Sequence, residues 1–495
     1  MRSRTRSSAV LSAVLALVLL IAACTGSTAG NGSLAGSDDP QSEVSETPRP
    51  GPSTGSASPS PSPSPAACPA RAIEPDPDRP VVDLTFVVSD DLATVQGQET
   101  VRFTPDRPVD ELVFRLTPNT APSVDEGNRI DILRATADHG GQAPRYEPAD
   151  AAPDTQGGLL ILPLASTVRA GTTITAQIAF QITLGLNSFD RFGRGNGFAW
   201  FASAHPLLAW EQGVGWHTEP MLQFTAESAT SEAADTTIAV TAPADLTVLM
   251  SGNPLTGERR GAQTVWTGEL AAARDVAVSV GPFQVADIAV DAGGSQPVAL
   301  RVGAPTQAVA LRLQKEFVRA LEDLSDLLGP YPFPSLSVAR LPGSGGGIEY
   351  PGAILMLDSS TLVSVHETAH MWFYAMVGNS QAEHAWLDEA FASWAEQVVN
   401  DDPPPASTLD RMGVVDTPTA DYGGNAGNYY FVTYDKGAAA LHAAREAAGA
   451  KAFDAAIRCY INANAWTIAD PADVAAALAD LPEAIAVLER AGALP

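Results

Sequence analysis

Apolar residues recur with a period of two along the first large stretch of the chain. Between about residues 70 and 285 they occupy alternate positions, as at Ile178, Phe180 and Ile182. Strict alternation is typical of strands with one buried face, and Gly, Pro, Asp and Asn punctuate these runs as turn residues do. The pattern predicts an antiparallel β-sandwich domain over residues 70–285.

After residue 285 the pattern changes from strands alone to a mixture of strands and helices. A few strand-like runs come first, and one long helix then carries an apolar stripe that ends at Gly329-Pro330. The stripe consists of Leu313, Phe317, Leu321, Leu324 and Leu328. Strands, helices and an Ala-rich helical end predict a second, α+β domain over residues 286–495. The chain is therefore multi-domain.

Two further helices are expected close together in this second domain. Residues 359–377 contain many apolar residues and neither Gly nor Pro, and Gly378-Asn379 ends the run. A second helix is predicted from Ser380, where Ser380 and Glu383 have the spacing of a capping box, to Val399. A short turn between them makes the two helices antiparallel neighbours.

Candidate metal chemistry lies on these two helices. His366 and His370 are four residues apart, so a helix places both rings on one face. Glu389 follows His370 after 18 residues and lies on the neighbouring helix. Two histidines and a glutamate are a standard ligand set for catalytic zinc, with one position kept for water. Glu367 is then placed to take a proton from that water, which predicts a zinc hydrolase with one ion. The alternative is a pair of ordinary helix histidines.

The N-terminal residues predict export. Arg2, Arg4 and Arg6 precede an apolar run over residues 9–23 that is too short to span a bilayer comfortably, as in a signal peptide of residues 1–23. Ile21-Ala22-Ala23-Cys24 resembles the bacterial lipobox, in which the cysteine is lipidated. An ordinary signal peptide cut at a small residue is the alternative.

Residues 24–69 are rich in Ser and Pro and contain few apolar residues. Such a segment cannot bury enough surface to fold, so a disordered tether is expected. Together with lipidated Cys24 it predicts an extracytoplasmic protein, lipid-anchored to the outer face of the bacterial cell membrane. Outside the cytoplasm the redox conditions allow a disulfide between Cys68 and Cys459. The sequence does not decide between this disulfide and two free thiols.

The formal net charge of −28 argues against nucleic acid or an anionic membrane surface as a partner. It fits a solvated acidic exterior and says little about substrate. Oligomeric state is not indicated by the sequence.

The motifs resemble those of the gluzincin zinc aminopeptidase family. Besides the histidine motif with Glu389, Trp386 to Ala392 is similar to the family's Trp-Leu-Asn-Glu-Gly-Phe-Ala segment, and Gly346 to Tyr350 to its Gly-x-Met-Glu-Asn signature. Tyr434-Asp435-Lys436-Gly437 resembles its Tyr-x-Lys-Gly segment, and residues 328–334 resemble the stretch that leads into the substrate-binding strand. The match is strong from about residue 285 to 445 and only architectural before that.

The resemblance implies a thermolysin-like catalytic domain, a catalytic role for Tyr434 and a substrate-binding role for Glu349 with Gly346 and Gly347. Tyr434 would donate to the oxyanion of the tetrahedral intermediate, and Glu349, in the Gly346-Gly347 segment, would pair with the free α-amine of a peptide. Ile348 and Tyr350 depart from the family's Met and Asn.

The function implied is a membrane-tethered zinc aminopeptidase that removes N-terminal residues from peptides. Few residues follow Tyr434, so the family's large C-terminal helical domain is expected to be missing and the cleft to be open. An endopeptidase with an open cleft is therefore one alternative. A non-catalytic surface-binding lipoprotein on a peptidase scaffold is the other, although binding alone does not require the three ligands together with Glu367.

Overall fold

The structure is a computed structural model of the 495-residue chain. It describes residues 68–188, 191–220, 224, 230–252, 257–343, 345–357 and 359–495. The predicted signal peptide, the lipidation site Cys24 and the tether up to residue 67 lie outside the described residues. Among the helices that are described, none is both long and apolar enough to cross a membrane.

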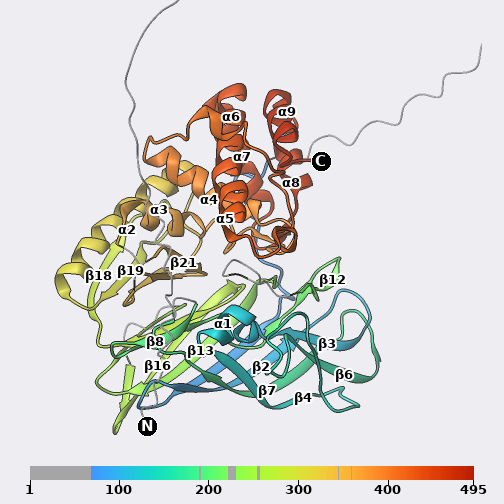
Figure 1. Cartoon of the computed structure of the whole chain (residues 1–495), viewed down its shortest axis with the longest axis vertical. Helices are drawn as coiled ribbons and strands as arrows, with labels where there is room; N and C mark the ends of the chain where they lie inside the picture. The colour runs from blue at the N-terminus through green and yellow to red at the C-terminus, as the bar shows by residue number, and fades with distance from the viewer. Residues whose placement is uncertain are drawn as a thin grey trace, which may run out of the picture. The chain divides into compact units, whose positions relative to one another are not determined.

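A seven-stranded sheet forms one layer of the N-terminal region (Figure 1). In spatial order its strands are β15 (Gly257–Arg260), β16 (Gln263–Ala273), β13 (Ala234–Pro243), β1 (Val81–Val88), β2 (Thr94–Phe103), β7 (Ile174–Thr183) and β4 (Arg129–Ala137). Neighbours are antiparallel except β1 and β13, which pair in parallel. Burial alternates along β7, as the period of two predicts.

Two four-stranded sheets share the core with this layer. One contains β10 (Leu207–Leu208), β3 (Val109–Arg115), β6 (Leu159–Val168) and β5 (Arg145–Glu147), and the other β14 (Thr247–Met250), β17 (Ala277–Gly281), β9 (Phe198–Ala202) and β8 (Phe192–Gly195). The ring of Phe86 on β1 contacts those of Phe180 on β7 and Phe201 on β9, with centroids 6.2 and 5.1 Å apart. The predicted sheet-rich N-terminal sandwich is confirmed, with one parallel pair that alternation does not reveal.

The second region is built on a five-stranded sheet. Its order is β18 (Gln284–Val290), β19 (Val298–Ala304), β20 (Ser335–Arg340), β22 (Ala353–Met356) and β21 (Gly347–Tyr350). The central strands β19, β20 and β22 run in parallel, and the edge strands β18 and β21 are antiparallel to their neighbours. Helix α2 (Gln307–Leu328) connects β19 to β20, and Thr306 caps it by accepting from Val309 N. All five residues of the predicted apolar stripe are buried.

Helices complete the second region. They are α3 (Thr361–Ala369), α4 (Trp386–Val399), α5 (Ala426–Tyr429), the π-helical segment Tyr430–Lys436, α6 (Gly437–Ala448), α7 (Ala450–Ala463), α8 (Pro471–Ala477) and α9 (Pro482–Ala491). Helix α6 packs against α4 and α9. The predicted α+β region with a helical end is confirmed.

The helix predicted over residues 359–377 is wrong in its second half. Helix α3 ends at Ala369, and the backbone turns at Tyr374, whose φ is 91°. Long-range pairing replaces the helix: Trp466 N donates to Met376 O, and β23 (Gly378–Asn379) pairs with β24 (Ile468–Ala469). The apolar run is buried on all sides, so its composition could not distinguish helix from buried loop.

The capping box predicted at Ser380 is also wrong. The backbone N–H groups of Glu383 and His384 donate to Ser380 O in a separate turn, and α4 begins at Trp386. His384 contacts Asp416 instead, at 2.8 Å between Nδ1 and Oδ1. Asp388 and Glu389 are consequently placed in the first turn of α4, where the helix dipole favours negative charge.

A buried arginine joins the sandwich to the second region. Arg274 donates to Thr467 O at 2.6 Å, to Met376 O at 3.4 Å and to Ser231 O at 3.0 Å. A Cβ on Gly378 would overlap the guanidinium, so a larger residue at that position would displace Arg274. A separate apolar cluster, which includes Trp200, Phe283 and Leu355, packs β9 against β20 and β22. The structure also joins the sulfurs of Cys68 and Cys459, whose Cα atoms lie 5.2 Å apart.

His217 lies in a buried ionic network of the sandwich. Its Nδ1 is 2.6 Å from Glu219 Oε1 and its Nε2 is 2.6 Å from Glu211 Oε2, while Arg115 contacts Glu219 at 3.1 Å. Burial opposes a charged ring, but the hydrogen bonds and charges of the two carboxylates outweigh it and raise the pKa of His217 to about 9.

We expect His217→Gln to lower the free energy of unfolding at pH 7 by about 2 kcal/mol, because it removes the positive charge between Glu211 and Glu219 and leaves only Arg115 beside Glu219. The folded-state pKa is above the ordinary value, so this stabilisation is complete below about pH 6.5 and is lost as pH rises through about 9. Urea unfolding of both proteins at pH 7 and pH 10 measures the difference. A gap of the same size at both pH values would contradict the assignment.

Candidate metal centre

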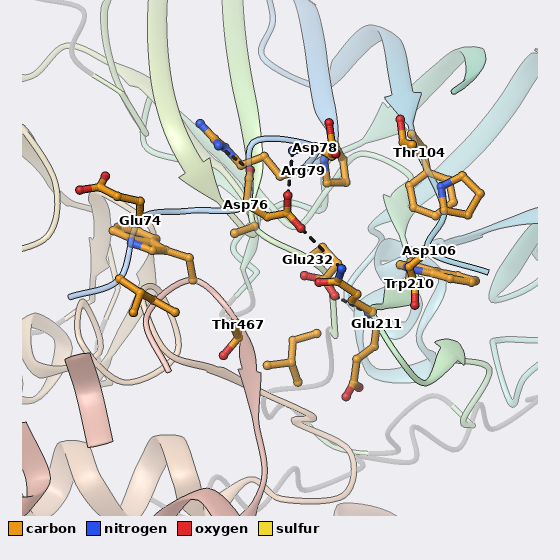
Figure 2. Close-up of a pocket in the computed structure, with 18 of the residues that line it drawn as sticks. Glu74, Asp76, Asp78, Arg79, Thr104, Asp106, Trp210, Glu211, Glu232 and Thr467 are labelled. Carbon is orange, nitrogen blue, oxygen red and sulfur yellow. Dashed lines mark hydrogen bonds between the residues drawn. The ribbon is translucent and has the colours of Figure 1, made fainter. Parts of the chain in front are cut away.

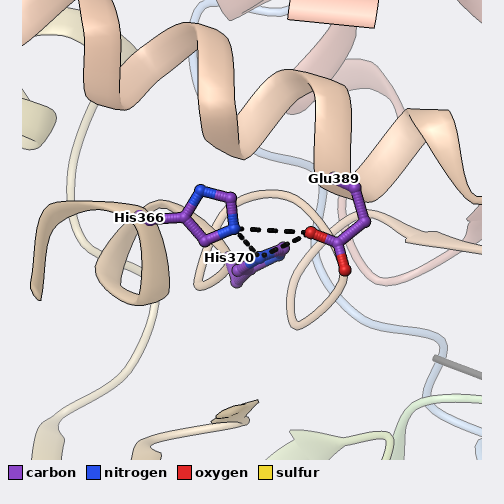
Figure 3. Close-up of side chains that lie close together, drawn as sticks. All are labelled: His366, His370 and Glu389. Carbon is purple, nitrogen blue, oxygen red and sulfur yellow. Dashed lines mark hydrogen bonds and ion pairs between the residues drawn. The ribbon is translucent and has the colours of Figure 1, made fainter. Parts of the chain in front are cut away.

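Three side chains converge between α3 and α4 (Figure 3). His366 Nε2 lies 3.1 Å from His370 Nε2, and Glu389 Oε2 lies 3.4 Å from each of these nitrogens. Figure 3 shows the carboxylate of Glu389 reaching from α4 toward the two rings. The sequence predicted this convergence, and the structure brings these three residues together.

The spacing fits one tetrahedral zinc ion. Bonds of about 2.0–2.1 Å in a tetrahedral site place ligand atoms about 3.3–3.4 Å apart. The side chains of His370 and Glu389 are almost fully buried, and Glu389 Oε2 has no hydrogen-bond partner among the described residues. Two imidazoles and one carboxylate are donors that zinc prefers, so the residues fit the ion.

Local helix geometry explains how the three groups meet. His366 lies in the last turn of α3 and His370 directly follows it, with its N–H donating to His366 O, so both rings leave the same side. Glu389 lies in the first turn of α4. The positive end of the α4 dipole reduces the cost of burying its carboxylate there.

The cluster is electrostatically arranged to hold positive charge. Burial disfavours charged imidazole, but Glu389 and Glu396 outweigh burial at His366 and raise its pKa to about 9. Glu349, Asp388 and Glu389 likewise raise the pKa of His370 well above its usual value. Burial would raise the pKa of Glu389, yet the two histidines lower it. Protons and a divalent cation therefore compete for the same groups.

Two carboxylates behind the histidines were not predicted from the sequence. Asp388 Oδ1 lies 2.7 Å from His370 Nδ1, and Glu396 Oε2 lies 3.4 Å from His366 Nδ1. Histidines that bind metals through one ring nitrogen commonly donate a hydrogen bond from the other ring nitrogen to such a carboxylate. Glu396 follows Glu389 by seven residues, two turns along one face of α4, and this spacing was the available signal.

Glu367 and Glu349 lie beside the triad. Ligand atoms of these two glutamates and of His370 lie within 4.8 Å of one another. Glu349 comes from edge strand β21 and is 4% exposed, and Glu367 comes from α3 and is 5% exposed. Gly347 on β21 allows this approach, because a Cβ there would lie 2.5 Å from Glu367 Cγ. Gly346 accepts from Leu357 N at 3.0 Å and closes the base of the strand pair.

Tyr434 reaches the triad from a π-helical segment, Tyr430–Lys436. Its hydroxyl donates to Glu389 Oε1, and its ring stacks on His366 with centroids 5.9 Å apart. The rings of Tyr429 and Tyr430 contact the ring of Tyr434. Lys436 is directed elsewhere, because its ammonium donates to the carbonyls of Arg411 and Gly413 at 2.6 Å.

A separate cavity of about 580 Å³ contains none of the predicted site residues (Figure 2). Figure 2 shows acidic side chains around it, among them Asp76, Asp106 and Glu232. Trp210 and Trp466 add aromatic surface. Glu232 accepts from Gln212 N at 2.6 Å, and Asp76 accepts from Asp78 N at 2.8 Å. Hydrogen bonds within the protein thus already satisfy part of its acidic surface.

Residues 330–422, which include both histidines and Glu389, match the peptidase family M1 domain. This segment is similar to the M1 peptidase domain. This confirms the predicted resemblance to the gluzincin aminopeptidases. Aminopeptidase M1-C of Oryza sativa subsp. japonica is 24% identical over 241 residues, which are 42% of this chain and 27% of that protein. Aminopeptidase M1 of Arabidopsis thaliana is 26% identical over 214 residues, covering 36% and 23% respectively. The chain thus spans about a quarter of the length of these relatives.

Solved structures share the fold over most of the chain. An M1 zinc metallopeptidase from Deinococcus radiodurans aligns with a TM-score of 0.61 at 20% identity, over 84% of this chain and 93% of that one. A mutant M1 zinc metallopeptidase from Deinococcus radiodurans, bound to a Tyr-Ser-Ala substrate, aligns with a TM-score of 0.59 at 20% identity, over 84% and 94%. These alignments show a shared two-domain fold with the sandwich first.

Proposed function

We propose that this chain is a zinc-dependent aminopeptidase that removes N-terminal residues from peptides. The observation that carries the proposal is the triangle of His366 Nε2, His370 Nε2 and Glu389 Oε2, with sides of 3.1–3.4 Å. The match to the M1 domain supports a peptidase. A tripeptide substrate bound to a protein of the same fold supports peptides as the substrate class.

His366, His370 and Glu389 would hold the zinc ion. A bound zinc ion supplies Lewis acidity, which makes water nucleophilic near neutral pH and polarises a scissile carbonyl. The carboxylate of Glu367 lies next to His370, where it accepts the proton of the attacking water and returns it to the leaving amine. The hydroxyl of Tyr434 lies beside Glu389, and in the reaction its proton turns from Glu389 Oε1 to donate a hydrogen bond to the developing oxyanion.

Glu349 supports exopeptidase action. Its buried carboxylate lies close to Glu367 and His370, so a peptide ammonium paired with it has its first peptide bond near the site of hydrolysis. A carboxylate opposite an ammonium in a confined site gives both binding free energy and register along the substrate.

Glu367→Gln should reduce kcat by about 100- to 10,000-fold, because the amide cannot accept the proton. Zinc content should stay at that of the unchanged protein, since Glu367 is not one of the three ligands. Steady-state kinetics on an aminoacyl reporter and elemental analysis of the same sample measure the two effects. Near-full turnover at unchanged zinc content would refute the role of Glu367.

Glu349→Gln should lower kcat/KM for substrates with a free amine by about 10- to 100-fold, because a charge-assisted contact is lost. The matched comparison uses the same aminoacyl reporters with an N-acetyl block. The unchanged protein should cleave these blocked reporters poorly, and Glu349→Gln should cleave them no more slowly. Equal cleavage of blocked and free substrates by the unchanged protein would favour the endopeptidase alternative. Zinc binding without cleavage of either substrate would favour the non-catalytic binding protein.

We further propose that the protein is exported and anchored through a lipid on Cys24, as the arginines, apolar run and lipobox-like sequence at the N-terminus indicate. A disulfide between Cys68 and Cys459 suits that compartment, and the Cα separation of 5.2 Å suits the bond.

Peptide mapping without reductant, on protein isolated from its own cells, should therefore recover the peptides of Cys68 and Cys459 as one linked species. Addition of reductant should separate them. Recovery of both peptides with free thiols, from protein alkylated at lysis, would exclude the bond.

A further inference from the structure

Asp388 is buried behind His370 and takes no part in the chemistry proposed above. Its side chain is fully buried, and its Oδ1 lies 2.7 Å from His370 Nδ1. The opposite ring nitrogen, His370 Nε2, is the one that faces His366 Nε2 and Glu389 Oε2. Asp388 and the zinc position therefore lie on opposite sides of one imidazole.

A neutral imidazole carries its proton on only one of its two nitrogens. A carboxylate next to Nδ1 favours the tautomer with the proton there, which leaves the lone pair of Nε2 for a metal. The negative charge also makes the ring a stronger donor. The position of Asp388 thus matches what His370 needs in order to bind zinc through Nε2.

Asp388 is itself held in place. Gln381 donates from Nε2 to Asp388 Oδ2 at 3.1 Å, and the side chain of Gln381 is also buried. Asp388 lies in the first turn of α4, immediately before Glu389, so one helix start fixes both the carboxylate behind the ring and the one in front of it. Rotation of Asp388 away from His370 would break the contact with Gln381.

The second histidine has a weaker version of the same arrangement. Glu396 Oε2 lies 3.4 Å from His366 Nδ1, and its side chain is 18% exposed. Greater distance and access to water both weaken the interaction between the carboxylate and the ring. The two histidines are therefore supported unequally.

We propose that Asp388, held by Gln381, is a positioning residue that fixes the tautomer and orientation of His370 and so increases the affinity of the site for zinc. Glu396 performs the same role for His366 to a smaller extent. The inference rests on the proposed zinc site and assigns a function to residues outside its ligand set.

The test measures zinc affinity by competition with a chromophoric chelator, starting from metal-free protein. Asp388→Asn preserves the size of the side chain and removes its charge, and it should raise the apparent Kd for zinc by about 10- to 100-fold. Glu396→Gln should raise it by a smaller factor. The matched control is Asp454→Asn, which removes a carboxylate paired with Arg445 on α6 and should leave zinc affinity unchanged.

Melting temperatures of the metal-free proteins show that each variant is folded. If Asp388→Asn does not fold, Gln381→Leu decides the question, because it keeps the carboxylate and removes the group that holds it. A several-fold weaker zinc affinity in that variant supports the proposal. The proposal is overturned if a folded Asp388→Asn binds zinc with an affinity within about threefold of the unchanged protein. If Asp388→Asn does not fold, the same result for Gln381→Leu overturns it. Absence of zinc binding by the unchanged protein would instead refute the proposed function.

Discussion

The meeting of three ligand atoms between α3 and α4 is the constraint on which the rest of the structure depends. Two imidazoles and a carboxylate lie within 3.1–3.4 Å of one another in a buried site, and four further carboxylates surround them: Glu349, Glu367, Asp388 and Glu396. So much buried negative charge is costly without a cation. A bound divalent ion would therefore balance the excess negative charge of the site.

The backbone around the site is organised to hold this cluster. Helix α3 ends at Ala369, directly before His370. Helix α4 begins at Trp386, so Asp388 and Glu389 lie in its first turn. Residues 371–381 between them are buried, and this segment is held by the pairing of β23 with β24 and by Arg274 from the sandwich. The sandwich therefore contributes to the site indirectly, through the position of the loop that joins the two helices.

Local sequence was sufficient for the elements that carry a simple period. Alternation predicted strands such as β7, and the stripe of Leu313 and Phe317 predicted α2. Spacing alone predicted that His366, His370 and Glu389 meet. The end of α3 could not be predicted, because residues that pair with the loop lie almost ninety positions later, at Trp466 and Thr467. Asp388 and Gln381 were missed for a related reason, since a buried contact across a turn leaves no periodic pattern.

The central claim is that these three side chains bind one zinc ion. The most direct test is X-ray diffraction from crystals of the zinc-loaded protein, with data collected on both sides of the zinc absorption edge. A zinc ion bound by these side chains should give one strong anomalous peak within about 2.1 Å of His366 Nε2, His370 Nε2 and a Glu389 carboxylate oxygen. A folded, zinc-soaked crystal with no peak between α3 and α4, or with its peak elsewhere, would contradict it.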